Sequence, residues 1–332
     1  IFTSVPTGAS SGKITVASTV NESKTVFETD FIVAEPVLEA NLVMDLVYPG
    51  HPIYEDSYQA VIYDINIVTE DNYYALLSTF SGFYPHHIFR ITPTSVDTIV
   101  FNLNQTGRAF HYGLAMDKLG NIYVPIGHTI CKISPNGILD TIAGSTKGFE
   151  EGPGEAAKFD DPMDVGIDQE GNLYVADAGN NRVRKISHDG MVTTFAGGTV
   201  GDSDGWGTSA QFYGPMAIFV DKNNLIWLTE FNGTRVRTIT PEGLVSTYAG
   251  SLHGYYDASQ KEHAHFQGLW GIAVDDNGSV YVADNGNKAI RKISTSGQVT
   301  TLMQDICAFG LTIDTDGNLL AACSEIHKIV LN

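Results

Sequence analysis

A stretch of sixteen residues occurs twice in this chain with few changes. The first copy, NLYVADAGNNRVRKIS, runs from Asn172 to Ser187, and the second, SVYVADNGNKAIRKIS, runs from Ser279 to Ser294. Such a recurrence indicates either a duplicated site or an architecture built from repeats. The two interpretations differ in their predictions, because an architectural repeat recurs at a regular period along the whole chain.

A short apolar segment that ends in aspartate before a turn gives the period. Five such segments are YGLAMDKLGN, DVGIDQEGN, AIFVDKNN, GIAVDDNGS and GLTIDTDGN, and their aspartates are Asp117, Asp168, Asp221, Asp275 and Asp314. Successive aspartates are 51, 53, 54 and 39 residues apart. A sixth, degenerate copy, DINIVTEDN, runs from Asp64 to Asn72. This regular spacing favours structural repeats.

Each copy has the same order of strand and turn signals. The apolar strand (A) and its Asp/Gly turn are followed by an alternating strand (B), a polar loop, a strand such as RVRKIS (C), a short turn and a fourth strand such as VTTFAGG (D). Four short strands joined by tight turns form an antiparallel meander that is marginal alone and must stack on its neighbours. The sequence therefore predicts an all-β fold, a six-bladed β-propeller of four-stranded blades with strand A lining the axis.

The last copy is incomplete and predicts how the ring closes. After strands A, B and C, the chain reaches its last printed residues at HKIVLN. The stretch VLEANLVMDLVYP, residues 37–49, precedes blade 1 and fits no other blade. Because an unpaired edge strand is a liability, we expect this N-terminal strand to complete blade 6.

The repeats resemble a known family. The stretches PMDVGIDQEGN, VADAGNNRVRKIS, VADNGNKAIRKIS and TTFAGG look like NHL repeats, and the resemblance extends over roughly residues 58–332. Blades 1, 2 and 6 depart from the pattern, with altered B–C loops such as VPIGHTICKIS, so their residues inherit no family role.

A second resemblance concerns the N-terminal residues. VPTGASSGKITV followed by TVFETDFIV looks like the closing strands of an IPT/TIG domain, an immunoglobulin-like sandwich. The domains expected are therefore 1–34, the C-terminal part of an IPT/TIG domain, and 35–332, the propeller. This order is similar to that of exported bacterial surface proteins, often lipoproteins linked to glycan use. The resemblance implies an extracytoplasmic protein at the cell surface or in the periplasm, with a lipid anchor upstream. A stray hairpin packed on the propeller is the alternative interpretation of these residues.

Charge and composition exclude some classes of partner. The formal net charge is −19, with only 19 Lys and Arg residues, so phosphate backbones would repel the chain and nucleic acid is not an expected partner. No apolar run is long enough to span a bilayer. Cys307 and Cys323 fall on neighbouring strands of the last repeat; a disulfide and two inert buried thiols both remain open.

The long B–C and D–A loops lie on one face of a propeller, and function tends to occupy long loops on a rigid scaffold. The aromatic and acidic residues singled out there are Tyr84, Trp206, Tyr213, Tyr255, Tyr256 and Asp204. Flat aromatic faces bury the apolar faces of sugar rings, and carboxylates accept hydrogen bonds from hydroxyls. A glycan, a partner protein, or simple packing of the inserts would each use these residues.

Two further groups of residues are candidate sites. His86, His87, His111 and His128 fall on the long-loop face of blades 1 and 2, where they would converge on a divalent metal. Long loops also gather histidines by chance. Asp64 and Asp164 occupy the same strand A position near the axis; they would hold a cation or ordered water, or else be solvated acids at the channel mouth.

The conspicuous Arg and acid sets favour structure over catalysis. Asp177, Arg182 and Arg184 in one blade recur as Glu230, Arg235 and Arg237 in the next, which indicates a contact needed once per blade. No catalytic residue is predicted, because the chain has no G-x-S-x-G, H-E-x-x-H or P-loop motif. The sequence favours a non-catalytic binding or scaffold protein linked to glycan handling. Because some NHL propellers are metal-dependent lyases, the alternative is a metal-dependent lyase or hydrolase at the channel mouth.

Overall fold

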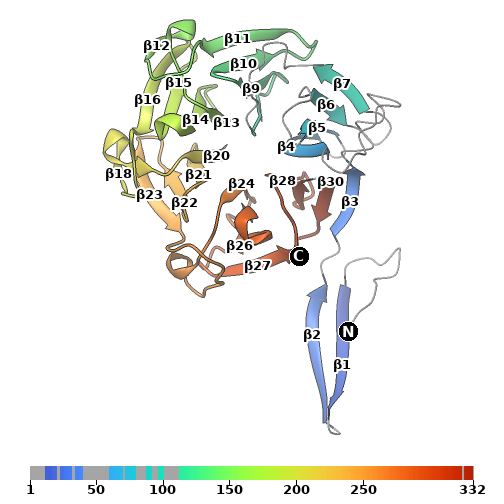
Figure 1. Ribbon diagram of the computed structural model, residues 1–332. Coiled ribbons are helices and arrows are strands. Elements are labelled where there is room, and N and C mark those ends of the chain that lie inside the picture. Colours follow the sequence, from blue (N-terminus) through green and yellow to red (C-terminus); the bar gives the residue numbers. More distant parts are fainter. Residues whose placement is uncertain are drawn as a thin grey trace.

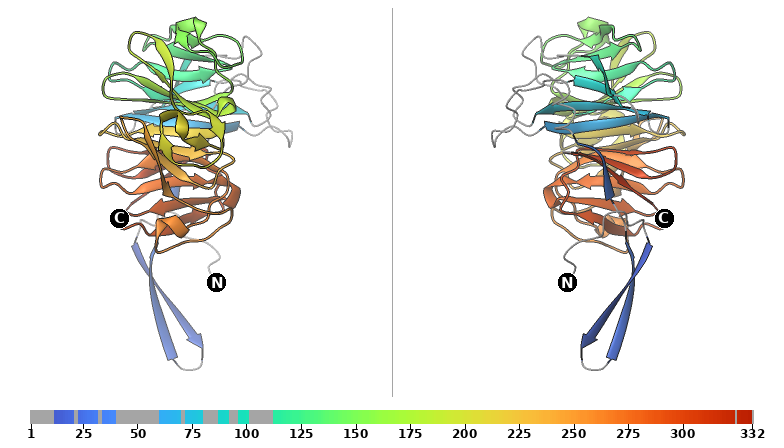
Figure 2. Two further views of the ribbon diagram at one scale, coloured as in Figure 1. Left: turned by 90° about the vertical axis from the view of Figure 1, so that its left-hand side faces the viewer. Right: turned by 90° about the vertical axis from the view of Figure 1, so that its right-hand side faces the viewer.

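The molecule is a β-propeller in which consecutive sheets surround a central axis (Figure 1). The structure is a computed structural model that describes residues 12–20, 23–31, 34–39, 60–69, 72–79, 87–91, 96–100, 112–323 and 325–331. Seen from the side, the ring is a disc that is much wider than it is thick (Figure 2). The predicted all-β propeller fold is confirmed.

The described residues form six antiparallel sheets of four or five strands around the axis, and we number them 1 to 6. Sheet 1 consists of β4 (Ala60–Thr69), β5 (Asn72–Thr79), β6 (His87–Ile91) and β7 (Val96–Val100). Sheet 2 consists of β8 (Ala115–Met116), β9 (Ile122–Ile126), β10 (Thr129–Ile133) and β11 (Leu139–Gly144). Sheet 3 consists of β13 (Pro162–Ile167), β14 (Leu173–Asp177), β15 (Arg182–Ile186), β16 (Met191–Gly197) and the added edge strand β12 (Gly152–Pro153).

The remaining sheets repeat this plan. Sheet 4 consists of β20 (Pro215–Val220), β21 (Ile226–Glu230), β22 (Val236–Ile239), β23 (Leu244–Ala249) and the edge strand β18 (Gly205–Trp206). Sheet 5 consists of β24 (Leu269–Val274), β25 (Val280–Asp284), β26 (Ala289–Ile293) and β27 (Val299–Gln304). Sheet 6 consists of β28 (Gly310–Ile313), β29 (Leu319–Ala322), β30 (Glu325–Ile329) and β3 (Ala34–Glu39).

Short elements complete the described structure. A hairpin of β1 (Gly12–Val20) and β2 (Ser23–Phe31) lies outside the ring (Figure 1). Within the inserts, β17 (Thr199–Val200) pairs in parallel with β19 (Gln211–Phe212). Five single-turn 3₁₀ helices lie in loops: η1 (Gly154–Ala156), η2 (Ala178–Asn180), η3 (Gly207–Ser209), η4 (Lys261–His263) and η5 (Asn285–Asn287). No helix of the described residues has the length and apolar character needed to cross a bilayer.

An N-terminal strand does supply the outer strand of sheet 6. β3 pairs antiparallel with β30, from Ala34 opposite Ile329 to Glu39 opposite Glu325. This strand overlaps the predicted segment 37–49 only in its last three residues and begins earlier than predicted. Residues 40–49 lie outside the described part of the chain.

The recurring aspartate fixes the turn between strands A and B. Asp168 Oδ1 accepts the backbone N–H groups of Glu170 at 3.0 Å and Asn172 at 2.8 Å, and its Oδ2 accepts the Tyr174 hydroxyl at 3.2 Å. Asp117 and Asp275 repeat this set. One side chain thus closes the turn and ties it to strand B, which explains the recurrence of aspartate in the sequence.

The hydrophobic core lies between adjacent sheets and includes the long inserts. Ala157 and Phe159, Ala210 and Phe212, and Ala264 and Phe266 are all 0% exposed. Each pair joins a cluster made by the sheets before and after it. This packing between repeats explains why Ala and Phe recur two residues apart.

Buried arginines hold each insert to its sheet. Arg184 is fully buried; its Nη1 lies 3.0 Å from Asp177 Oδ2, and it also donates to the carbonyls of Lys158 and Glu150. The other oxygen of Asp177 accepts the Asp160 N–H at 2.8 Å. Arg237 and Arg291 repeat this arrangement with Glu230 and Asp284. These residues therefore serve the architecture of each repeat.

Candidate functional site

A bulge at the start of the inner strands determines which side chains face the axis. In β13, Pro162 pairs with Asp177, and the next pair is Val165 with Val175, so two residues lie outside the ladder. The same skip occurs between Pro215 and Ile218 in β20 and between Leu269 and Ile272 in β24. A bulge suspends the alternation of faces along a strand. Adjacent residues, such as Trp270 and Gly271, can therefore both face the channel.

The two residues of this bulge, and the equivalent residues of the other repeats, differ in size. The first position is large in every repeat: Tyr63, Tyr112, Met163, Met216, Trp270 and Phe309. The second is small or acidic: Asp64, Gly113, Asp164, Ala217, Gly271 and Gly310. The axial residues predicted from the sequence, Asp64 and Asp164, occupy the second position. The large residues one place earlier recur in the sequence at the same period and were not predicted to face the axis.

Four of these large residues, together with Phe231 from the loop after β21, form a layer of aromatic rings across the axis. The Trp270 ring centroid lies 4.7 Å from that of Tyr112, 4.9 Å from Phe309 and 5.8 Å from Phe231. Tyr63 contacts Tyr112 and Phe309 at 5.0 and 5.4 Å. All of these pairs have edge-to-face geometry, which the ring quadrupoles favour. We call these five residues the aromatic layer.

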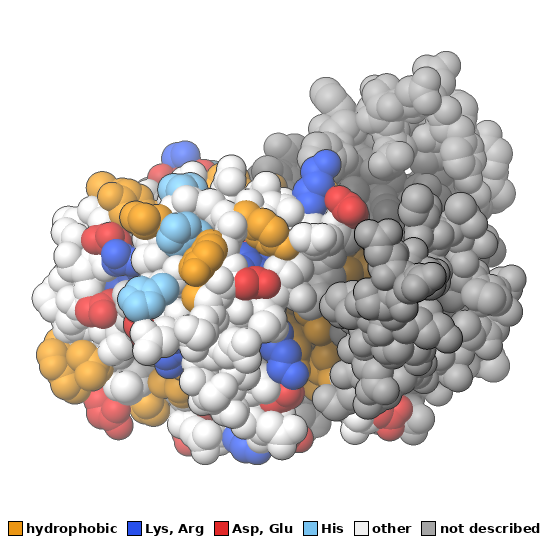
Figure 3. All heavy atoms as spheres, turned by 90° about the horizontal axis from the view of Figure 1, so that it is seen from below, with side chains coloured by type: hydrophobic (Ala, Val, Ile, Leu, Met, Phe, Trp, Pro, Cys, Tyr) orange, Lys and Arg blue, Asp and Glu red, His pale blue; other side chains and the backbone are white. Residues whose placement is uncertain are grey.

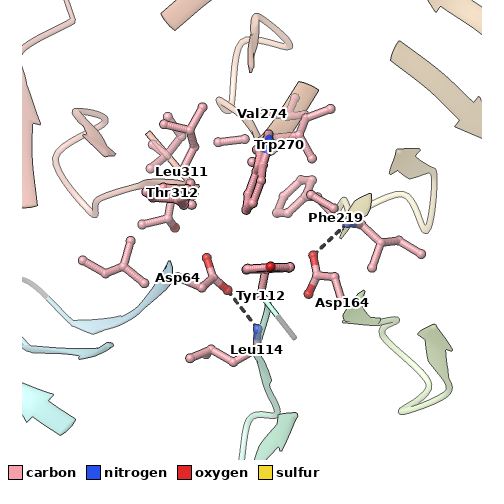
Figure 4. Close-up of a pocket in the computed structure, with 18 of the residues that line it drawn as sticks. Asp64, Tyr112, Leu114, Asp164, Phe219, Trp270, Val274, Leu311 and Thr312 are labelled. Carbon is pink, nitrogen blue, oxygen red and sulfur yellow. Dashed lines mark hydrogen bonds between the residues drawn. The ribbon is translucent and has the colours of Figure 1, made fainter. Parts of the chain in front are cut away.

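On one side of the aromatic layer lies a cavity of about 420 Å³ on the axis, which we call the axial cavity. Asp64 and Asp164 both point into it, on either side of Tyr112 (Figure 4). The Leu114 N–H donates to Asp64 Oδ2 at 2.9 Å, and the Ile218 N–H donates to Asp164 Oδ2 at 2.8 Å. Each aspartate thus ties its own sheet to the inner strand of the next one.

The environment of the two aspartates raises their pKa values. Burial raises the pKa of Asp164 to about 7, against the opposing effect of the Ile218 and Val165 amides. Burial, and then the negative charge of Asp164, raise the pKa of Asp64 well above its ordinary value. At pH 6 the pair therefore carries less than its full double negative charge, which weakens its attraction for a cation.

The raised pKa values of these aspartates predict that the folded protein becomes less stable as pH rises. A carboxyl group whose pKa is higher in the folded than in the unfolded state binds a proton on folding, so its stabilising effect is lost as pH rises from about 4 to about 7. Buried Asp177, whose pKa is raised to about 6, acts in the same direction. We expect a higher Tm at pH 5 than at pH 8. Carboxyl groups whose pKa is lowered in the folded state, such as that of Asp117, change the stability only below about pH 4, outside this range.

Thermal unfolding followed by circular dichroism between pH 4.5 and 8.5 measures this effect. The Asp164→Asn protein should show a smaller difference in Tm, because an amide oxygen can still accept a hydrogen bond but does not ionise. A wild-type Tm that rises over this range, or an unchanged pH dependence in the variant, would contradict the prediction.

On the other side of the aromatic layer, at the long-loop face, lies a cavity of about 650 Å³ that we call the mouth cavity. The whole aromatic layer lines it, together with the amide side chains of Asn232, Gln267 and Asn285. His253 and Cys307 complete the polar lining, and among the described residues no carboxylate, lysine or arginine contributes. The cavity thus combines aromatic rings with neutral hydrogen-bonding groups.

A smaller cavity of about 310 Å³, the rim cavity, adjoins the mouth cavity. Asn232 and His253 line both. Its other lining residues include Tyr213, Thr234 and the ion pair of Asp202 and Arg235, whose Oδ2 and Nη2 atoms are 2.8 Å apart.

The structure places the predicted ligand-binding aromatics in different surroundings. Trp206 lies in β18 at the outer edge of sheet 4, opposite Leu244. The Tyr255 hydroxyl hydrogen-bonds Thr301 of β27, and Tyr256 packs beside His265. Tyr213 alone of this group lines a cavity described above, the rim cavity. Asp204 is held by Arg237 at 2.8 Å, and Tyr84 lies outside the described residues.

The exposed side chains of this group do not merge into one apolar surface. Trp206 lies against the outer strand of sheet 4 and Tyr255 against that of sheet 5. In the view of Figure 3, hydrophobic side chains lie in separate groups among charged, histidine and neutral residues. The aromatic residues of the inserts therefore did not indicate the position of the mouth cavity.

Of the four histidines predicted to bind a metal, only His128 has a described side chain, and it lies beside two aspartates. His128, Asp160 and Asp161 bring ligand atoms within 4.8 Å of one another. Lys147 Nζ lies 2.9 Å from Asp160 Oδ1 and 3.7 Å from Asp161 Oδ2, so an ammonium group already balances part of the negative charge of these carboxylates. His86 and His111 lie outside the described residues, and only the backbone of His87, in β6, is described. The four-histidine metal site stays a prediction.

None of the three cysteines forms a disulfide. Cys131 and Cys323 are buried, whereas Cys307 is exposed and lines the mouth cavity. Cys307 and Cys323 form no disulfide, and the interpretation of both as buried thiols is wrong for Cys307.

Parts of the chain are similar to known repeat-containing proteins. Residues 159–186 and 266–293 match the NHL repeat model. Human teneurin-4 is 29% identical over 214 residues, 54% of this chain and 8% of that protein. Human NHL repeat-containing protein 3 is 25% identical over 217 residues, 58% of this chain and 55% of that protein. The chain thus spans at most about half the length of these curated relatives.

Solved structures share the fold at low sequence identity. A Bacteroides thetaiotaomicron protein of unknown function aligns with a TM-score of 0.63 and 17% identity, covering 96% of this chain and 82% of that one. An auxiliary nutrient binding protein from Bacteroides ovatus gives 0.63 and 11%, covering 96% and 83%. Virginiamycin B lyase from Staphylococcus aureus gives 0.57 and 13%, covering 91% and 100%. The chain is a β-propeller that carries NHL repeats.

Proposed function

We propose that this protein is a six-bladed, non-catalytic, extracytoplasmic binding protein whose ligand, a glycan, occupies the mouth cavity. The observation that carries the proposal is the lining of that cavity by five aromatic residues and three amide side chains. A volume of about 650 Å³ is within the range of small-molecule sites. The six sheets act as a rigid frame that fixes the aromatic layer at the axis.

The chemistry of the lining favours a neutral, hydroxyl-rich ring over other ligands. Aromatic faces accept the apolar face of a sugar, and amide groups both donate to and accept from hydroxyls. A cationic ligand would find no carboxylate among the described lining residues, and an anionic ligand would find no lysine or arginine. Among the described lining residues, no carboxylate accompanies His253 and Cys307 as a general acid or base.

The proposed location outside the cytoplasm rests on the fold of the nutrient binding proteins and on the N-terminal sequence. Proteins named as auxiliary nutrient binding proteins of Bacteroides share this fold over 96% of the chain. We infer the same setting here, with residues 1–34 as the end of an IPT/TIG domain, residues 35–332 as the propeller and a lipid anchor upstream. The full reading frame tests this inference, because a reading frame without an export signal or lipidation cysteine would contradict it.

Replacing Trp270 by alanine should abolish glycan binding. Trp270 contacts three other rings of the aromatic layer, so its loss removes both a binding surface and the packing that holds its neighbours. Glycan-array screening followed by calorimetry measures the effect, and circular dichroism checks that the variant folds. Trp206→Ala is the matched control, since this residue lies at the outer edge of sheet 4 and should leave binding unchanged. Loss of binding in Trp206→Ala alone would contradict the assignment.

Cys307 offers a second measurement that needs no substitution. It is the exposed thiol of the three and lines the mouth cavity, whereas Cys131 and Cys323 are buried. A glycan bound in the cavity should slow alkylation of Cys307 by a maleimide reagent. Alkylation at the same rate with saturating glycan would contradict binding at this place.

A metal-dependent lyase or hydrolase is the second candidate. Virginiamycin B lyase has a propeller of the same fold, and His128 with Asp160 and Asp161 is the described cluster of ligand type. Metal analysis of the purified protein tests this candidate. A stoichiometric transition metal that is lost in His128→Ala would favour it over the binding protein.

A further inference from the structure

The mouth cavity and the rim cavity share a wall. Asn232 and His253 line both, so the two cavities meet at this pair of side chains. Asn232 follows β21, and His253 belongs to the insert that precedes β24, so the junction lies between sheets 4 and 5. The two cavities are therefore neighbours between these sheets.

The rim cavity differs chemically from the mouth cavity. Arg235 donates to the Asp202 carbonyl at 2.7 Å and lies 2.8 Å from its carboxylate, so the two charges neutralise each other. The Asp202 side chain is 54% exposed, which leaves carboxylate acceptor sites open. Glu230 is already engaged by the Tyr213 N–H and by Arg237. The cavity thus presents acceptors, donors and one partly exposed aromatic ring, that of Tyr213.

The volumes set the size of what each cavity can hold. The rim cavity, at about 310 Å³, is at the lower end of the usual range for ligand sites, whereas the mouth cavity is about twice as large. One ring-sized unit fits the smaller space. An occupant of both cavities must therefore be a chain whose units are linked across Asn232 and His253.

We propose that the ligand is an oligosaccharide of at least two sugar units, with one unit in the mouth cavity and the next in the rim cavity against Tyr213. This inference rests on the proposed function and adds chain length as the determinant of affinity. A monosaccharide bound in the mouth cavity does not contact Tyr213, Asp202 and Arg235 of the rim cavity.

Calorimetry on the full chain tests the inference with defined probes. These probes are glucose, galactose, mannose and xylose, each compared with its β-linked and α-linked disaccharide and trisaccharide. In a series that binds, we expect the trisaccharide to bind about tenfold more tightly than the monosaccharide. Tyr213→Ala should remove this gain and leave monosaccharide affinity unchanged, whereas Trp270→Ala should abolish the binding of both monosaccharide and trisaccharide. Tyr256→Ala, which is exposed outside both cavities, is the matched control.

The possible failures are distinguishable. Equal affinities for monosaccharide and trisaccharide in a series that binds would overturn this inference and leave the proposed function intact. The inference is also overturned when Tyr213→Ala, folded by circular dichroism, retains the full gain. If no member of any series binds and none protects Cys307 from alkylation, both this inference and the proposed function are wrong.

Discussion

Arg237→Ala is expected to lower the free energy of unfolding by about 3–5 kcal/mol, the cost of removing one partner of a buried ion pair. The guanidinium is fully buried and lies 3.4 Å from Glu230 Oε2 and 2.8 Å from Asp204 Oδ1. It also donates to the carbonyls of Gln211 and Ser203 in the insert. Alanine would leave Glu230 and these carbonyls without their partner inside the protein, where water cannot replace it.

Arg235→Ala is the matched control for this loss, because it removes the same side chain from the same sheet. Arg235 is paired with the exposed Asp202, and a surface ion pair contributes about 1 kcal/mol or less. Urea denaturation of both variants measures the difference. Equal destabilisation would show that the buried arginines do not hold the inserts in the way described above.

Gly113→Ala is expected to destabilise the ring by a second mechanism. A Cβ atom at this position would lie 1.7 Å from Asp164 Oδ1 and 2.1 Å from Cγ. Overpacking typically costs about 1–3 kcal/mol. Displacing Asp164 would also break its hydrogen bonds to the Val165 and Ile218 amides, which adds about 1–3 kcal/mol for each buried group left unpaired.

A double-mutant cycle with Asp164→Ala separates these contributions. If the clash is with the Asp164 carboxyl group, shortening that side chain should relieve it, and Gly113→Ala should cost much less in the Asp164→Ala background. Additive costs measured by urea denaturation would contradict the close approach of these two residues.

The sequence was sufficient for the features that each repeat needs once. Asp168 makes its hydrogen bonds within six residues along the chain, so its role in the turn recurs wherever the repeat recurs. Arg184 and Asp177 contact across adjacent strands at a fixed spacing of seven residues. Such local, repeated contacts are visible in a single sequence, and for this reason the propeller and the structural role of the buried arginines could be predicted.

The aromatic layer was not predicted, because five of the six repeats contribute one ring each and the rings meet only at the axis. Regular alternation would direct Trp270 and Gly271 to opposite faces of the strand. The bulge between Leu269 and Ile272 suspends that alternation, and a bulge has no clear signature in these residues. The aromatic residues of the inserts, such as Trp206, were easier to recognise but lie elsewhere.

The closing strand begins earlier than predicted and contains a proline, which has no backbone N–H to donate. The predicted segment started at residue 37, whereas β3 includes Pro36. β3 is the outer strand of sheet 6, and an outer strand tolerates proline, above all at a bulge. The register does shift between Pro36 and Leu38, so Pro36 lies beside an irregularity that accommodates it.

The pairing of β3 with β30 also bears on how the chain acquires its structure during translation. β3 leaves the ribosome before every other described strand of the ring, and β30 leaves after all of them. At typical elongation rates of about 5–20 residues per second, β3 waits roughly 15–60 s for its partner. During that interval its edge can pair with a neighbouring nascent chain on the same messenger RNA. Moving residues 34–39 behind residue 332 by circular permutation would remove the wait, and the yield of monomer after rapid expression should rise.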